Sequence, residues 1–211
     1  MSRGAESASA KEARGAGVAT AEIPLFPLNT VLFPGGPLPL RIFEPRYVDM
    51  VRYCMRERAP FGVVLIRAGA EVGQVTSAAD IGTSARIVDF FQLPDGLLGI
   101  TCLGERKFRV LSRRTKDDGL NMGTVDWLPP EPAADLPGEF AHLGQLLRKE
   151  LPQLGDIYQS TPKHFDDASW VGARLAEILP IDLADKQVCL ELDDPIDRLA
   201  RLSPFIRRAE D

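Results

Sequence analysis

The hydrophobic positions between Ile23 and Leu128 follow the pattern of β-strands and turns. A short continuous apolar run, FGVVLI at 61–66, is typical of a strand buried on both faces. The triplet Pro94-Asp95-Gly96 predicts a tight hairpin turn, and the pair Gly104-Glu105 is expected to separate two further strands. The expected strands are therefore 38–43, 61–66, 83–93, 97–103, 107–113 and 122–128.

Proline is concentrated between Ile23 and Tyr47. Because proline cannot donate to a sheet ladder, this stretch predicts short edge strands broken by turns, one of them at Gly35-Gly36. Pro45 suits the first turn of a helix, where its missing N–H costs nothing. The residues that follow it recur at helical spacing and form one apolar stripe: Tyr47, Met50, Val51, Cys54 and Met55.

The pattern changes again after Leu128. The segment PPEPAADLPG at 129–138 has no periodicity and marks a boundary. Beyond it, apolar residues recur at helical spacing in two stripes, at 140–154 and 170–179. Asp182 is expected to cap a third helix and Asp194-Pro195 to open a fourth, which Pro204 should kink or end.

These patterns predict an α+β fold, with a small, partly open antiparallel β-barrel, one inserted helix, and a helical bundle after it. We expect a tail at 1–21, a barrel unit at 22–128, a proline-rich linker at 129–138 and a helical unit at 139–211. The tail consists of small and charged residues with too little apolar surface to order itself, so we expect it to be mobile.

The charge balance narrows the range of partners. Lys and Arg number 25 against 30 Asp and Glu, which gives a net charge of −5 over 211 residues and disfavours both nucleic acid and anionic lipid as partners. No run approaches the ~20 apolar residues that span a bilayer. The three cysteines, Cys54, Cys102 and Cys189, suit neither a disulfide framework nor a metal knuckle, so we expect a reducing, cytoplasmic location.

No residue pattern predicts catalysis. The histidines His142 and His164 fall in a helix and in a loop, and neither a G-x-S-x-G nor an H-E-x-x-H motif occurs. Helix capping and solvation explain the acidic residues near the last helix better than metal binding does: Glu191, Asp193, Asp194 and Asp197. We therefore expect no enzymatic activity, no cofactor and no metal.

Several segments together resemble the amino-terminal domain of Lon proteases. The most specific is IFEPRY at 42–47, and the helical region is similar to the distal part of that domain over 174–199. The other matching segments are LFPL at 25–28, LFPGGPLPL at 32–40, PFGVVL at 60–65, Gly69 with Gly73, DIGTSARI at 80–87 and GERKFRV at 104–110. This resemblance covers most of the chain, which far exceeds a chance motif match.

The resemblance implies a pseudo-barrel like the PUA RNA-binding fold, followed by a helical bundle. In full-length Lon enzymes this domain helps to recognise unfolded polypeptide before cleavage. The chain has no G-x-x-x-x-G-K-[ST] motif and no room for an ATPase or a Ser-Lys protease module, so it resembles the stand-alone bacterial members. We therefore expect a non-catalytic module that binds unfolded or partly folded polypeptide, with an adaptor role for a separate protease or chaperone as one form of this function.

Candidate contact residues lie within the matched segment, as apolar anchors and the charges around them: Phe33, Phe43, Tyr47, Arg41, Glu44 and Arg46. One interpretation, favoured for most of them, places the aromatic rings in the core and pairs Glu44 with an arginine at the strand-to-helix corner. In the other, they line a groove between barrel and helices that accepts apolar peptide segments. An edge next to the proline-rich strand could also accept an added strand.

Two alternatives remain. The PUA-like architecture makes RNA a candidate ligand, with its best local support in the cluster Arg113, Arg114 and Lys116. Asp117 and Asp118 follow this cluster at once, however, which favours a solvated hairpin tip. A hydrolase or small-molecule enzyme is the least favoured reading, because it needs a base beside a nucleophile in a buried polar pocket.

Overall fold

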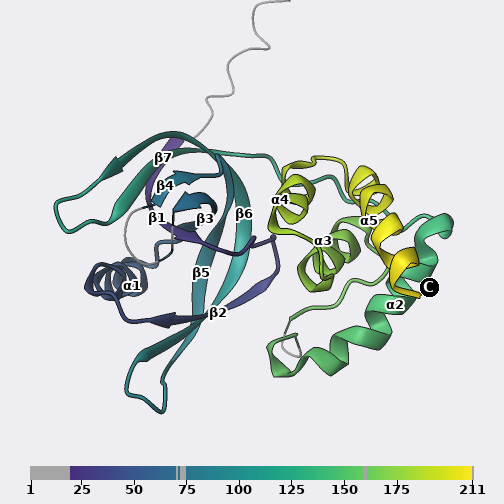
Figure 1. Ribbon diagram of the computed structural model, residues 1–211, viewed down its shortest axis with the longest axis horizontal. Coiled ribbons are helices and arrows are strands. Elements are labelled where there is room, and N and C mark those ends of the chain that lie inside the picture. Colours follow the sequence, from purple (N-terminus) through teal and green to yellow (C-terminus); the bar gives the residue numbers. More distant parts are fainter. Residues whose placement is uncertain (1–19, 70, 72–74, 159–160, 211) are drawn as a thin grey trace, which may run out of the picture.

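The computed structural model describes residues 20–69, 71, 75–158 and 161–210. The strands and α1 lie towards one end of the long axis, and helices α2–α5 lie towards the other (Figure 1). The expected tail falls almost entirely outside the described residues, as does Gly73. In chain order the strands and longer helices are β1 Thr20–Leu28, β2 Pro37–Ile42, α1 Pro45–Glu57, β3 Phe61–Gly69, β4 Val75–Ala78, β5 Ile81–Gln92, β6 Leu98–Thr115, β7 Asn121–Trp127, α2 Ala141–Glu150, α3 Ala168–Ile178, α4 Leu183–Glu191 and α5 Pro195–Glu210.

The sheet closes on itself. Its strands follow the order β1-β7-β6-β5-β3, and β1 also pairs in parallel with β3, so that these strands form a ring. The other pairings in this ring are antiparallel. The ring encloses a small apolar core: Ile23, Leu25, Val64, Phe108, Val110 and Val125. This arrangement, with helices after the sheet, confirms the predicted fold class.

The predicted break at Gly104-Glu105 is wrong, because β6 runs without interruption from Leu98 to Thr115. Gly104 instead allows two backbones to touch: its N–H donates to Gly36 O at 2.9 Å, and Gly35 N–H donates to Gly104 O at 2.8 Å. A Cβ at Gly104 would lie only 2.2 Å from the carbonyl oxygen of Phe33. The glycine therefore serves close packing rather than a turn.

Helix α1 begins at Pro45, as predicted, and packs its apolar stripe on the sheet at the far side from α2–α5 (Figure 1). Tyr47 stacks on Phe26 of β1 with ring centroids 3.9 Å apart. Met55, the last member of the predicted stripe, is exposed instead. The helix ends at Glu57, and the C-cap residue Arg58 adopts the left-handed region (φ 52°) and donates its N–H to Cys54 O.

Helices α2–α5 share one core with the strand region. Val31, Phe33 and Leu65 belong to the same buried cluster as the inward residues of α3 and α5. Asp194 caps α5, as predicted, by accepting the N–H of Ile196 at 2.8 Å. The helix does not end at Pro204 and continues to Glu210. No helix in the described part of the chain is long and apolar enough to cross a membrane.

Candidate functional site

The six residues singled out from the sequence do not share one surface. Phe33 and Tyr47 are buried, in different apolar clusters. Glu44 and Arg46 form an ion pair at 2.7 Å, and Arg46 also donates to Gly119 O at 3.0 Å, so that they fix the corner at the start of α1. These four side chains thus have structural contacts in the folded chain.

Phe43 and Arg41 are the exposed members of that set. Phe43 follows β2 directly, and its side chain is 52 % exposed. Arg41 pairs with Asp95 at the turn between β5 and β6. Arg41 of β2 is in register with Gly99 of β6. Arg41 and Phe43 therefore lie on the part of the sheet formed by β2, β6 and β5.

An exposed apolar group on β5 was missed by the sequence reasoning. Val88, Phe90 and Phe91 are all solvent-exposed, and Phe90 is 59 % exposed. The adjacent pair Phe90-Phe91 is the sequence signal for this exposed group. Because successive strand residues point to opposite faces, the two rings cannot both lie on one buried face. Beyond Ala85 the strand leaves the ring, and residues 86–92 are exposed apart from the half-buried Ile87.

A groove of about 350 Å³ lies between the end of α1 and β5, and we call it the β5 groove. Met55, Val88 and Phe90 give it an apolar character, and Arg58 and Arg86 stand among them. Arg86 pairs with Glu105 at 2.6 Å, whereas Arg58 makes no ion pair among the described residues. The full lining is Cys54, Met55, Arg58, Ala59, Arg86, Ile87, Val88, Asp89 and Phe90.

A second groove, of about 330 Å³, lies on the other side of α1 against β1 and the β6–β7 hairpin. Its apolar lining includes Tyr53, Pro60 and Met122. The charges at its rim are largely paired: Arg114 contacts Glu22 through two hydrogen bonds, at 2.7 and 3.0 Å. Helix α1 is thus flanked by apolar concave surface on both sides.

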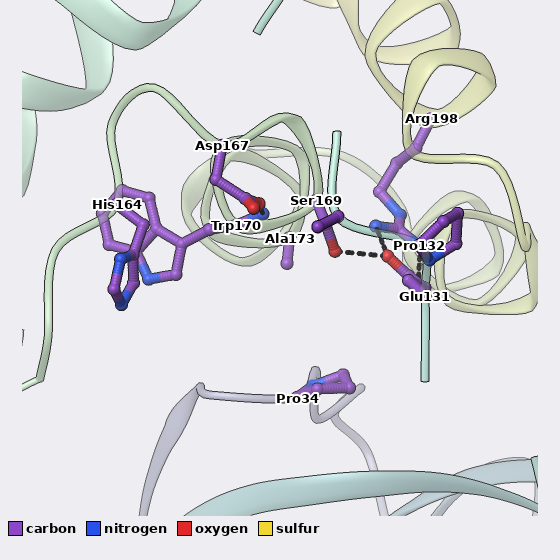
Figure 2. A pocket seen from close by; sticks show the side chains of 10 residues that line it. Pro34, Glu131, Pro132, His164, Asp167, Ser169, Trp170, Ala173 and Arg198 are labelled. Atoms are coloured by element: carbon purple, nitrogen blue, oxygen red, sulfur yellow. Dashed lines mark hydrogen bonds and ion pairs between the residues drawn. The ribbon is translucent and has the colours of Figure 1, made fainter. Parts of the chain in front are cut away.

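A third cavity, of about 320 Å³, lies between the proline-rich linker, α3 and the turn at Pro34; we call it the linker pocket. Figure 2 shows Glu131, Ser169 and Arg198 on one side, His164 and Trp170 on the other, and Pro34 opposite them. Ser169 Oγ donates to Glu131, and both guanidinium ends of Arg198 reach its carboxylate.

Glu131 organises the polar side of the linker pocket. Lys107 of β6 contacts it at 3.1 Å, so two buried cations share this carboxylate. Burial alone would raise the pKa of Glu131, but the hydrogen bonds and charge of Arg198, with help from Ser169 and Lys107, hold that pKa below its ordinary value. Its acceptors are occupied by structural partners, so the carboxylate is not poised as a base.

A described hydroxyl group of the linker pocket does contact a carboxylate, but two cations hold that carboxylate as well. Ser169 donates to a carboxylate that is already saturated, and His164 contacts Trp170 edge-on with centroids 6.2 Å apart. Asp167 accepts the N–H of Trp170 at 2.7 Å and so caps α3. Burial raises the pKa of the Cys54 thiol to about 11 and that of Cys102 to about 12, which keeps both protonated.

Three of the four acidic residues considered as metal ligands have other contacts. Glu191 pairs with Arg67 at 3.4 Å, Asp193 contacts Lys107 at 3.4 Å, and Asp194 caps α5. Within the described ranges, no three His, Cys, Asp or Glu residues form a group that could hold a metal ion. The two grooves beside α1 combine apolar side chains with charged ones, and their apolar parts suit the burial of apolar side chains.

The fold and sequence have clear relatives. A 39 % identical solved structure, the Lon N-terminal domain protein from Xanthomonas campestris, superposes with a TM-score of 0.73 and covers 87 % of this chain and 98 % of that one. The N-terminal domain of Mycobacterium avium complex Lon protease shares the fold at 17 % identity, with a TM-score of 0.62 over 88 % of this chain and 97 % of that one.

Curated relatives are much longer proteins. Lon protease 2 of Herpetosiphon aurantiacus is 27 % identical over 91 % of this chain and 24 % of its own length. Protein cereblon of Gallus gallus is 32 % identical over 51 % of this chain and 24 % of its own length. The chain thus spans about a quarter of the curated relatives that it matches. Since the family model matches residues 22–208, the chain belongs to the family of the ATP-dependent protease La (LON) substrate-binding domain.

Proposed function

We propose that this protein binds unfolded or partly folded polypeptide on the apolar surface around α1 and β5. The observation that carries the proposal is the β5 groove, where Met55, Val88 and Phe90 are exposed side by side on a folded strand and helix. Folded partners rarely offer loose apolar side chains, whereas unfolded chains do. Family membership supports the same conclusion, because the family is described as substrate-binding.

The energetics favour several weak apolar contacts. Burying one Phe or Leu side chain contributes about 1.5–3 kcal/mol. Two or three such contacts supply roughly 3–9 kcal/mol before the cost of ordering the peptide is subtracted, so we expect weak binding of any single segment. Apolar side chains of the groove select for apolar residues in the ligand rather than for one particular sequence. Such tolerance is what recognition of many unfolded clients requires.

The test is fluorescence anisotropy with labelled apolar peptides and a permanently unfolded client. We expect Phe90→Ser to weaken binding about tenfold, which corresponds to about 1.4 kcal/mol. Leu111→Ser is the matched control, because Leu111 of β6 is 55 % exposed and does not line the groove. Saturable binding that responds equally to both substitutions, or no binding to a broad peptide panel, would contradict the proposal.

An adaptor role is the finer form of this proposal, in which the bound client is handed to a separate protease or chaperone. A purified ATP-dependent protease should then degrade an unfolded client faster when the protein is added, and Phe90→Ser should remove the gain. If the protein binds the client but the degradation rate does not change when it is added, the function is restricted to binding.

RNA is the less supported ligand. In the cluster proposed for it, Arg113 pairs with Asp80 at 2.8 Å and Arg114 pairs with Glu22 at 2.7 Å. Two of the three cations are therefore already neutralised, and phosphate binding depends on cations that are not. A gel-shift titration with structured RNA at low salt should show at most weak binding, and tight, salt-sensitive binding would reverse the preference.

A further inference from the structure

Among the residues that the structure describes, no strand pairs with the outer edge of β5 beyond Ala85. On one side β6 pairs with β5 from Ile81 to Gln92, with register shifts at Ser84 and at Val88. On the other side β3 pairs with it only at Thr83, Ser84 and Ala85. The chain before β3 turns away through Ala59 and Pro60 into α1, so the line of β3 is left vacant beside the β5 groove.

We propose that the client binds there as an added β-strand, so that the protein selects extended segments with apolar side chains at alternate positions. This inference rests on the proposed function and specifies its binding mode. Strand addition uses main-chain hydrogen bonds for affinity and pockets for alternate side chains for selectivity.

The backbone of β5 offers the required hydrogen-bonding groups. Leu93 N–H donates to Leu97 O at 2.9 Å, so these two residues form a hydrogen-bonded pair at the hairpin end. Bonded and non-bonded pairs alternate in an antiparallel ladder, and therefore Phe90 and Gln92 direct their N–H and C=O groups away from β6. These residues carry two acceptors and two donors for an incoming strand, and one donor, the Phe90 N–H, is bonded to the Asp89 carboxylate in the free protein.

The groove matches the side chains of such a strand. Alternate residues of an added strand face the same side as Phe90, towards Met55 of α1 and Val88. Arg58 stands at the end of this groove, and among the described residues no carboxylate pairs with it. The occupant is thus an extended apolar segment with an acidic residue near one end, which meets the unpaired guanidinium.

Asp89 covers the open edge in the free protein. Its carboxylate accepts the N–H of Phe90 at 2.8 Å, the donor that an added strand needs. A charged side chain on an open edge also discourages pairing between two copies of the chain. A client must displace this carboxylate, so Asp89 reduces the affinity for the client while it protects the edge.

Two substitutions of Asp89 distinguish the effect of its hydrogen bond with the Phe90 N–H from the effect of its negative charge. Asp89→Ala frees the Phe90 N–H and should strengthen peptide binding severalfold. Asp89→Asn removes the charge but keeps an acceptor for the same N–H, so its affinity should stay closer to that of the wild type. Equal affinities for the two variants would overturn the role of the edge donor.

Backbone methylation of the peptide tests strand addition directly. Two versions of one alternating apolar peptide carry N-methyl groups on either the odd or the even residues, and each is titrated against the full-length protein by anisotropy. One version should lose at least tenfold in affinity, because its N–H groups face β5, and the other should stay within about twofold.

The outcomes distinguish the two proposals. If the unmethylated peptide binds and Phe90→Ser weakens it, but both methylated versions behave alike, the strand mode is overturned while polypeptide binding stands. If the unmethylated peptide does not bind at all, the proposed function fails. If sedimentation shows a dimer that does not bind the peptide, the open edge of β5 pairs with a second copy of the chain, and the client proposal is overturned.

Discussion

Gly104 occupies a point where β6 touches the backbone of the segment that precedes β2. A Cβ there would lie 2.2 Å from Phe33 O, a fixed backbone atom. We expect Gly104→Ala to lower the free energy of unfolding by about 2 kcal/mol or more, because the two backbones must separate and lose their hydrogen bonds. Urea denaturation measures this loss. Gly138→Ala is the control: a Cβ at that residue meets nothing within 4 Å, so its midpoint should barely move.

Glu177 is buried beneath the turn that contains Gly36. Arg174 contacts its carboxylate at 2.7 Å and Tyr158 OH donates to it at 3.3 Å, while Lys186 binds its backbone carbonyl at 2.6 Å. Burial raises the pKa of Glu177 to about 7, against the opposing effect of the Arg174 charge. The folded chain therefore holds this proton at a pH where the unfolded chain, with a Glu pKa near 4.5, has released it.

A pH dependence of stability follows. Because the folded state binds the extra proton, the contribution of Glu177 to stability falls as pH rises from about 4.5 to about 7, by up to about 1.4 kcal/mol per pH unit. Gln at this position cannot titrate. Thermal and urea unfolding at pH 5.5 and pH 7.5 should thus show a larger loss for the wild type than for Glu177→Gln. Parallel losses in both proteins would refute this assignment.

The contrast between Phe33 and Phe43 explains why the candidate site could be predicted only in part. Both follow an apolar residue and precede a turn or a helix start, so their local patterns are nearly the same. Phe33 is buried in an apolar cluster that includes residues of α3 and α5, far along the chain. Phe43 has no such cover and is exposed. Burial of this kind depends on tertiary contacts that periodicity does not encode.

At the scale of whole elements, start signals were more informative than breaks. Pro45 with its apolar stripe and Asp194-Pro195 correctly placed the starts of α1 and α5. Gly104-Glu105 and Pro204 suggested ends that do not occur. In α5 the inward face, with Leu199, Leu202 and Ile206 buried, keeps the helix together although Pro204 lacks one donor.

Two aspartates at helix starts allow a matched test of capping. Asp194 accepts the N–H of Ile196, whereas Asp182 precedes α4 without a side-chain hydrogen bond to its first turn. Asp194→Ala should cost about 1 kcal/mol of stability in chemical denaturation. Asp182→Ala removes the same charge from a similar place and should cost clearly less. Equal losses would mean that helix-dipole charge, rather than the hydrogen bond, dominates at both sites.

At the scale of the molecule, one carboxylate joins three segments. Glu131 of the linker receives Lys107 from β6 and Arg198 from α5, and the side chains of these cations are only 3 % and 1 % exposed. Lys107 also donates to the carbonyls of Leu190 and Leu192 at the end of α4, at 3.2 and 3.0 Å. Strands, linker and helices are thereby held together through buried polar contacts as well as through the shared apolar core.

Removing this carboxylate should destabilise the whole protein. Glu131→Gln leaves two buried cations without their partner, and we expect a loss of about 3–5 kcal/mol in the free energy of unfolding. Asp193→Asn is the control, because Asp193 contacts the same Lys107 but its side chain is 91 % exposed, and its loss should be small. Near-ultraviolet circular dichroism reports the tertiary packing around Trp127 of β7 and Trp170 of α3. Loss of packing in the strand region alone, or in the helical region alone, would contradict the role of Glu131 in joining the two.

The closure of the sheet by its first strand has a consequence for biosynthesis. Thr20 of β1 is in register with Asp126 of β7, and Leu25 is in register with Gly62 of β3. A ribosome therefore releases β1 long before its antiparallel neighbour exists, and pairings this distant along the chain are slow to form. Until translation passes Trp127, β1 lacks its antiparallel partner, and the nascent chain exposes an apolar strand that cellular holdases can recognise. A protein proposed to bind exposed apolar segments thus exposes such a segment itself while it is being made.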